Sequence, residues 1–216
     1  MTDAPMLFRD LPSRAVKRPL PVDPVALMAL RPAGGFGVLL GDPPWLFANW
    51  SEEGEAKNPN QIYDCMETDD ICDMPVSALL ADNAAMWLWG TSPMLMDCIR
   101  VMAAWGCTYK GFVPWVKQTK DGKGLAFDRG YWYRGAAEIV LFGTRGSPRR
   151  AKVPGAASVR NVIMAPRREH SRKPDHLHRT AELWFPNAQK LELFGRARRR
   201  GWTVFGNDLD KFPETT

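Results

Sequence analysis

Metal-binding and disulfide-forming residues are scarce in this sequence. Its 216 residues include three histidines and four cysteines, and no two cysteines have the CxxC spacing. The thiols are therefore expected to be reduced and buried or half-buried. They belong to Cys65, Cys72, Cys98 and Cys107. His176 and His178 would lie on different faces of a helix with no third ligand nearby, so no metal site is predicted.

Long apolar runs and nucleotide-binding signatures are also missing. No apolar run approaches the roughly 20 residues needed to span a bilayer, and the N-terminus lacks the charged-then-apolar pattern of a signal peptide. Neither a GxGxxG nor a Walker A sequence occurs, so nothing supports dinucleotide binding or nucleoside triphosphate hydrolysis. We therefore expect a cytoplasmic protein without membrane association.

The chain has the length and composition of one globular domain. Apolar residues make up 45% of it, which is typical of a soluble protein with a full core. Residues 1–33 contain six prolines and no sustained periodicity, so an irregular N-terminal arm is expected there. Residues 34–216 are expected to form the folded domain, without internal repeats.

Strand-like and helix-like segments alternate from residue 36 onward. Seven strands are expected, at 36–40, 84–90, 108–117, 136–143, 159–165, 190–195 and 202–206. Three helices are expected. The first, at 68–82, is capped by Thr68 and is continuous or broken, and the second, at 91–106, has Ser92 as N-cap, Pro93 at its first position and Gly106 at its end. The third, at 174–185, has Pro174 in its first turn. This order predicts an α/β fold, a mostly parallel sheet with helices on both faces and ligands at the carboxyl ends of its strands.

The stretch LLGDPPWLF places an acid, two prolines and a tryptophan directly after the first expected strand. Pro43 and Pro44 supply no N–H groups and fix φ at about −65°, so the strand ends and presents Asp42 and Trp45 on a stiff loop. Asp42 and the Pro43 carbonyl could accept the two hydrogens of an NH2 group while Trp45 stacks on the ring that bears it. The alternative is that the prolines only terminate a strand.

Basic residues cluster in the last third of the chain, although the net charge is only +5. The clusters are Arg145, Arg149, Arg150 and Lys152; Arg167, Arg168, Arg172 and Lys173; and Arg196, Arg198, Arg199 and Arg200. Each alone would be an ordinary solvated surface, but three clusters interspersed with aromatic residues favour a polyanionic partner. The long loop 118–134, rich in glycine, lysine and aromatics, is expected to be functional.

A second informative stretch is KLELFGRARRRGWTVFGNDLD. It predicts a strand with Glu192 near its end, followed by Phe194 and by Gly195, which would let the backbone approach a ligand. Asn207 and Asp208, at the end of the next strand, are well placed for ribose hydroxyls. The alternative is a plain strand followed by a basic surface turn.

Seven motifs together carry a family resemblance. DPPW at 42–45, IYDCM at 62–66, WLWGT at 87–91, PWVK at 114–117, HSRKPD at 170–175, ELFGR at 192–196 and GW…GN at 201–207 occur in this order. Their order resembles that of the DPPW-type adenine methyltransferases, relatives of the catalytic subunit of the eukaryotic messenger-RNA adenosine methyltransferase with bacterial and phage members. The similarity covers roughly residues 36–210. It implies a Rossmann-like fold that uses S-adenosylmethionine.

The resemblance also implies roles for individual residues. Asp42, Pro43, Pro44 and Trp45 match the motif that holds the target adenine amine. The implied cofactor-binding residues are Asp42, Lys173, Glu192, Phe194, Gly195, Arg196, Arg198, Asn207 and Asp208. The implied substrate-binding residues are Trp45, Tyr63, Trp115, Lys117, Trp132 and Glu138.

The sequence departs from the eukaryotic enzyme at several points. Arg198 replaces a histidine and Asp208 a glutamine, which bears on two of the implied cofactor contacts. No zinc-finger segment is present, which counts against a messenger-RNA role, and the small size favours DNA. We therefore expect methyl transfer to adenine in DNA. The alternatives are the same chemistry on RNA and a non-catalytic nucleic-acid-binding subunit of the same fold. Loops 46–62 and 118–134 are expected to read the target or to form a dimer interface, and the sequence leaves monomer and homodimer open.

Overall fold

One seven-stranded sheet organises the part of the chain that the structure describes. The computed structural model describes residues 22–46, 65–128, 132–168, 172–207 and 209–214. The strands are β1 (Phe36–Gly41), β2 (Leu80–Gly90), β3 (Thr108–Gln118), β4 (Ala137–Arg145), β5 (Ile163–Pro166), β6 (Lys190–Leu193) and β7 (Thr203–Phe205). Their order across the sheet is β5-β3-β4-β2-β1-β6-β7.

The sheet is mostly parallel, as predicted. Strands β2, β1, β6 and β7 pair in parallel, and so do β3 and β5. Among the described strands β4 alone runs in the opposite direction, because it pairs antiparallel with both β2 and β3. This is the α/β arrangement expected from the sequence. The carboxyl ends of the other six strands therefore meet at one edge.

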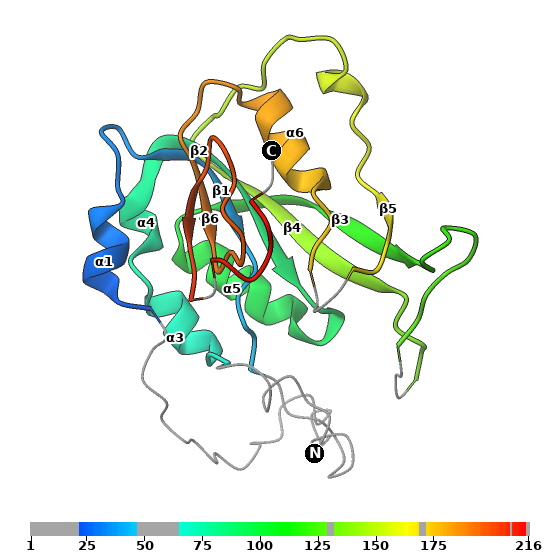
Figure 1. Cartoon of the computed structure of the whole chain (residues 1–216). Helices are drawn as coiled ribbons and strands as arrows, with labels where there is room; N and C mark the ends of the chain where they lie inside the picture. Colours follow the sequence, from blue (N-terminus) through cyan, green and yellow to red (C-terminus); the bar gives the residue numbers. More distant parts are fainter. Residues whose placement is uncertain (1–21, 47–64, 129–131, 169–171, 208, 215–216) are drawn as a thin grey trace, which may run out of the picture.

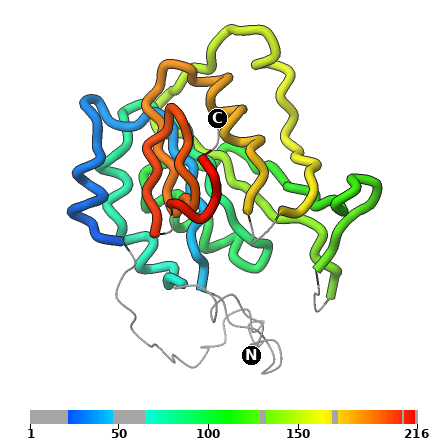
Figure 2. Tube along the Cα trace, viewed as in Figure 1, coloured from blue at the N-terminus to red at the C-terminus, as the bar shows by residue number. Residues whose placement is uncertain are grey.

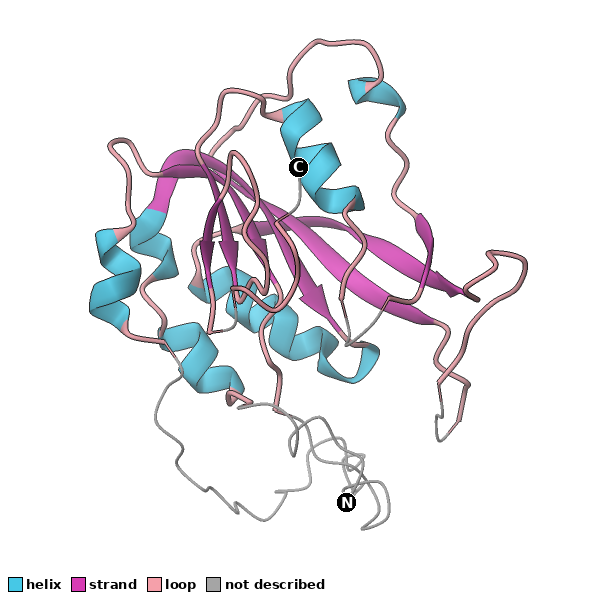
Figure 3. Cartoon of the chain, viewed as in Figure 1, coloured by secondary structure: helices cyan, strands magenta, loops and turns pink. Residues whose placement is uncertain are grey.

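Helices cover both faces of the sheet (Figures 1 and 3). The α-helices are α1 (Pro24–Ala29), α3 (Thr68–Asp73), α4 (Val76–Leu79), α5 (Leu95–Ala104) and α6 (His176–Trp184), and the 3-10 helices are η2 (Ser92–Met94) and η3 (Ala156–Ser158). Alternate residues of β2 divide between two cores, since Met86 and Leu88 join α1, α3, α4 and α5, whereas Trp87 and Trp89 join α6. Period-two alternation of a strand buried on both faces explains this division.

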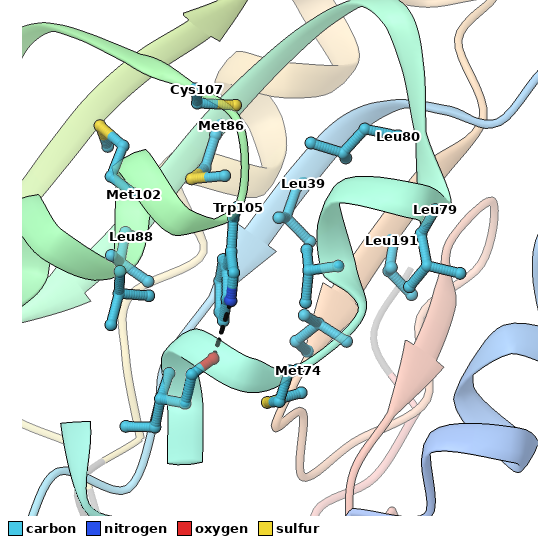
Figure 4. Close-up of a cluster of buried hydrophobic side chains, with 14 of the residues drawn as sticks. Leu39, Met74, Leu79, Leu80, Met86, Leu88, Met102, Trp105, Cys107 and Leu191 are labelled. Carbon is cyan, nitrogen blue, oxygen red and sulfur yellow. Dashed lines mark hydrogen bonds between the residues drawn. The ribbon is translucent and has the colours of Figure 1, made fainter. Parts of the chain in front are cut away.

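Trp105 anchors the larger core (Figure 4). Its side chain is fully buried, and its indole Nε1–H donates to the Ile71 carbonyl at 2.9 Å. This contact joins the end of α5 to α3. A buried indole needs such a partner because its N–H would otherwise lose the hydrogen bond it makes with water.

Several helix boundaries differ from those predicted. Thr68 is the first residue of α3, whose N-cap is Glu67. The segment after Ser92 begins as the 3-10 turn η2, with Thr91 as its N-cap, before α5 starts. The helix predicted at 68–82 is broken at Pro75, which is the N-cap of α4. Residues 80–82 are not helical but belong to β2, which begins before its continuous apolar run does.

Helix α6, strand β5 and the proline-rich N-terminal segment also differ from the prediction. Pro174 precedes α6, whose N-cap is Asp175, and β5 is shorter than the predicted strand. Helix α1 forms within the proline-rich segment expected to be irregular: Pro24 occupies its first turn, and the Asp23 side chain accepts a hydrogen bond from the Val25 N–H. A capping carboxylate and an N1 proline stabilise a helix start. Leu27 packs from α1 into the core.

The state of the four thiols agrees with the prediction from the sequence. All four cysteines are free; Cys98 and Cys107 are buried, and Cys65 and Cys72 are half-buried, as predicted. Burial raises the pKa of Cys98 to about 12 and that of Cys107 to about 11, which leaves both unreactive.

The β3–β4 connection projects away from the sheet (Figure 2). In the described part of the chain, none of the helices has the length and apolarity that crossing a bilayer requires.

Candidate active site

The DPPW loop lies at the carboxyl end of β1, next to the end of β6. The Asp42 N–H donates to the Leu193 carbonyl at 3.3 Å, which holds the start of the loop against β6. The Trp45 N–H donates to the Pro43 carbonyl at 2.9 Å, and the Met66 N–H donates to the Pro44 carbonyl at 2.8 Å. The two prolines therefore use their carbonyls to order the loop, since they have no N–H groups to donate.

The Trp45 side chain belongs to the core. It is 7% exposed, and its indole Nε1–H donates to the Trp89 carbonyl at 3.0 Å. This hydrogen bond ties the DPPW loop to the end of β2. In the structure Trp45 thus braces the loop, and its role as a stacking surface for a base stays a prediction.

A chain of ion pairs runs from the half-buried Asp42 into the β3–β4 hairpin. Lys173 Nζ lies 3.5 Å from Asp42 Oδ1 and 2.8 Å from Glu138 Oε2. The other oxygen of Glu138 lies 2.9 Å from Lys117 Nζ, which also pairs with Asp128 at 2.9 Å. Two lysines and two carboxylates, predicted for both cofactor and substrate roles, are therefore in one continuous network.

Burial and ion pairing act on these groups in opposite directions. Burial raises the pKa of Asp42, although the Lys173 cation opposes this rise. Burial would also raise the pKa of Glu138, but Lys173 and Lys117 outweigh it and hold that pKa below its ordinary value. For Lys173, burial would lower the pKa, but Asp42 and Glu138 outweigh it and raise it. Glu138 and Lys173 are therefore charged at neutral pH, and Lys173 favours the ionised form of Asp42.

An open pocket lies beside Asp42 at this edge of the sheet. Six of the predicted cofactor-binding residues line it: Asp42, Lys173, Glu192, Phe194, Gly195 and Arg196. It therefore offers cations that fit a carboxylate group, and carboxylates that fit an ammonium group or ribose hydroxyls. This set of donors and acceptors matches the polar groups of S-adenosylmethionine.

Gly195 is required by the packing around it. A Cβ at this position would collide with the Val204 side chain on β7, a constraint that the sequence did not reveal. Since Gly195 also lines the pocket, its role in letting the backbone approach a ligand stays a prediction. The preceding Phe194 adopts a φ of 64°, which is uncommon for a residue with a side chain.

Two further predicted cofactor residues, Arg198 and Asn207, do not line this pocket. Arg198 is an exposed residue whose Nε lies 3.3 Å from Asp210 Oδ1. Asn207 is exposed just after β7. Asp208 lies outside the described residues.

The predicted substrate residues are dispersed. Trp115 is buried, donates from Nε1 to the Ala165 carbonyl at 3.0 Å and meets the Trp89 ring edge-on at 6.0 Å, so it supports the pocket from within the core. Trp132 lies on the β3–β4 connection with 87% of its surface exposed. Tyr63 lies outside the described residues.

Sequence reasoning missed several residues of the pocket. Trp89, Arg172, Asp175, His178 and Phe212 also line it. His178 Nε2 lies 2.8 Å from Glu192 Oε2, and the guanidinium groups of Arg172 and Arg196 lie over the Phe212 ring. The spacing of Asp175 and His178, three residues apart on one helix face, was the available signal.

Comparison with known proteins settles the family. The family model described as MT-A70 matches residues 36–208. The chain belongs to the MT-A70 family. This match confirms the resemblance to adenine methyltransferases, and it contains every described residue of the pocket except Phe212.

Relatives of this MT-A70 chain come from eukaryotes and from a bacterium. The Arabidopsis thaliana protein named "N(6)-adenosine-methyltransferase MT-A70-like" is 31% identical over 180 residues, which cover 82% of this chain and 24% of the relative. The human "N(6)-adenosine-methyltransferase catalytic subunit METTL3" is 27% identical, over 82% of this chain and 29% of the relative. The Mycoplasma "Type II methyltransferase M.MunI" is 25% identical, over 82% of this chain and 79% of the relative. The MT-A70 chain thus spans about a quarter of the eukaryotic proteins but most of M.MunI.

Proposed function

We propose that this MT-A70 chain transfers a methyl group from S-adenosylmethionine to the exocyclic amine of adenine in DNA. The observation that carries the proposal is the position of Asp42, at the end of β1, beside Lys173 and at the wall of a pocket that Glu192 and Arg196 also line. A carboxylate at this place can hold an amine next to a bound cofactor.

Asp42 and Pro43 would activate the amine. The lone pair of an exocyclic adenine amine is delocalised into the ring, and hydrogen bonds from its two N–H groups to the Asp42 carboxylate and the Pro43 carbonyl would localise and aim it. The Pro43 carbonyl already accepts one hydrogen bond, from the Trp45 N–H, and its second lone pair is the one available to the base. Lys173 keeps Asp42 in the accepting, ionised form.

The pocket residues would hold the cofactor, which supplies an electrophilic methyl group when bound. Lys173 and Arg196 fit its carboxylate, and Glu192, oriented by His178, fits its ribose hydroxyls. Asn207 and Asp208 stay proposed ribose contacts. Arg198 is left out of this set because it pairs with Asp210 at the surface.

DNA is the proposed substrate because the bacterial relative M.MunI, matched over 82% of this chain, is named a type II methyltransferase. The basic clusters would hold phosphates and give affinity that falls with salt. Methylation of RNA is the second candidate, supported by the Pyricularia oryzae relative named "N6-methyladenosine RNA methyltransferase MTA1". Location in the cytoplasm, the domain division at residue 33, and the choice between monomer and homodimer stay predictions.

The test is methyl transfer from labelled S-adenosylmethionine to matched double-stranded DNA, single-stranded DNA and RNA, with mass spectrometry of the nucleosides produced. Label in N6-methyladenine of DNA alone is the expected result, and label in RNA alone would replace the DNA proposal. Asp42→Ala should retain nucleic-acid binding and lose transfer. Absence of both transfer and cofactor binding in the wild-type protein would favour a non-catalytic subunit.

A further inference from the structure

A second cavity lies on the other side of α6 from the candidate active site. It encloses about 450 Å³ between α6, the first half of β3 and residues 159–161. Helix α6 separates the two hollows, because His178 lines the active-site pocket whereas His176, Thr180 and Trp184 line the second cavity. None of the residues assigned above to methyl transfer lines this second cavity.

The cavity has an aromatic floor. The rings of Trp87, Phe142 and Trp184 form a mutually contacting set, with centroids 5.0 Å, 5.9 Å and 6.0 Å apart. Trp184 is fixed by its own hydrogen bond, from Nε1 to the Ala156 carbonyl at 2.9 Å. Rigid aromatic surfaces of this kind favour a flat ring as a ligand, since stacking orders few additional bonds.

His176 lines the cavity, although its Nε2 is closed off and has no hydrogen-bond partner within the described part of the chain. Burial lowers the pKa of His176, and the Arg179 cation lowers it further, so the imidazole is neutral at physiological pH. This side of the cavity therefore adds no charge, and a ring would meet it mainly as an apolar surface.

The rim of the cavity is basic. Lys110 on β3 and Arg160 on the segment before β5 are both exposed and line the opening. None of the described residues that line the cavity is acidic. A ligand with a negative charge outside its ring would therefore meet two cations and no repelling carboxylate.

We propose that this cavity binds a nucleotide, with the base against the half-buried Phe142 and Trp184 rings, which Trp87 supports from below, and the phosphate at Lys110 and Arg160. Its volume lies within the range of roughly 300–1,000 Å³ of small-molecule sites, which combine apolar walls with a few polar groups. The nucleotide comes either from solution or from the nucleic-acid strand bound by the protein. The inference goes beyond the proposed methyl transfer and does not depend on it, since it rests on different residues.

The experiment is titration calorimetry of the full chain with adenosine 5′-monophosphate, with S-adenosylhomocysteine present in excess to fill the active-site pocket. Ribose 5-phosphate, which has no base, should not bind measurably. Gly111→Leu fills the cavity, because Gly111 lines it and an added Cβ would meet no atom within 4 Å; it should abolish binding of adenosine 5′-monophosphate. Arg160→Ala should weaken binding about fivefold, as expected for an exposed charge-assisted contact.

Lys123→Ala is the matched control, since Lys123 is an exposed lysine on the β3–β4 connection and lines neither hollow. It should leave the affinity unchanged. Titration with a single-stranded oligonucleotide separates the two sources: Gly111→Leu weakens its binding if the nucleotide belongs to the strand, and leaves it unchanged if the nucleotide is free. Absence of binding by the wild-type protein, or binding unaffected by Arg160→Ala and Gly111→Leu, overturns the proposal.

Discussion

Replacement of Lys173 by methionine should reduce methyl transfer mainly by making Asp42 harder to ionise. With an effective dielectric constant of about 20, unit charges at the observed 3.5 Å separation attract by about 5 kcal/mol. The Asp42 side chain is 32% exposed, so solvent reduces this attraction to about 2–3 kcal/mol. At 1.36 kcal/mol for each factor of ten in rate, kcat/KM should fall by about a hundredfold on the acidic limb, where Asp42 is largely protonated in both proteins, and by less at higher pH.

The pH profile distinguishes this electrostatic effect from a general loss of structure. Because Lys173 opposes the rise in the pKa of Asp42, its removal raises that pKa further, and the acidic limb of kcat/KM should lie at higher pH in Lys173→Met than in wild type. Lys173→Arg keeps the cation and should retain most activity at neutral pH. Arg179→Met removes an exposed cation that lines neither hollow and should change neither quantity. A fall of less than threefold on the acidic limb, or an acidic limb at the wild-type position, would refute the reasoning.

Three further predictions concern stability and binding. Glu138→Gln should lower the free energy of unfolding at pH 7 by about 3 kcal/mol. Because the folded-state pKa of Glu138 lies below 4.5, its stabilisation of the wild-type protein is present above that pH and is lost as the pH falls through the folded-state pKa. The free energy of unfolding measured in urea should therefore vary less with acidic pH in the variant than in the wild type. Gly195→Ala should cost about 1–3 kcal/mol, since the added methyl group collides with Val204, and thermal unfolding alongside Gly111→Ala, which has open space, would show it; equal loss in both contradicts the packing argument. DNA affinity should fall steeply between 50 and 200 mM salt, by about a thousandfold if some six phosphates are contacted, and a flat salt dependence in filter binding would exclude the basic clusters as the contact surface.

The sequence predicted the sheet well because most strands contain a clear apolar run and are separated from the next by glycine, proline or helix-capping residues. The alternation of strands with helices was sufficient to predict a mostly parallel sheet with helices on both faces. It did not reveal that β4 runs antiparallel to its neighbours, since an apolar run predicts a strand but carries no information about the direction of that strand in the sheet. The 3-10 turn at Ser92 and the helix at Pro24 depend on local capping that competes closely with other turn geometries.

Candidate site residues were predictable where a motif is contiguous and not where contact joins distant segments. Asp42 and the ELFGR stretch were found because each stands at the end of a strand. The pairing of His178 with Glu192, and of Lys117 with Glu138, depends on how α6 and the hairpin pack, which no local pattern contains. Trp45 illustrates the limit, because its indole N–H is used inside the core.

The antiparallel direction of β4 determines which changes to the β3–β4 connection the site could tolerate. Since β4 runs opposite to its neighbours, its first residues lie at the carboxyl edge, and the β3–β4 register places Glu138 opposite Trp115. The hairpin therefore places Lys117 beside Glu138, which in turn contacts Lys173. The connection also contributes to this arrangement, since Asp128 pairs with Lys117 and the Lys117 N–H donates to the Ala136 carbonyl. A replacement of the connection would have to keep both contacts for the charges beside Asp42 to hold their positions.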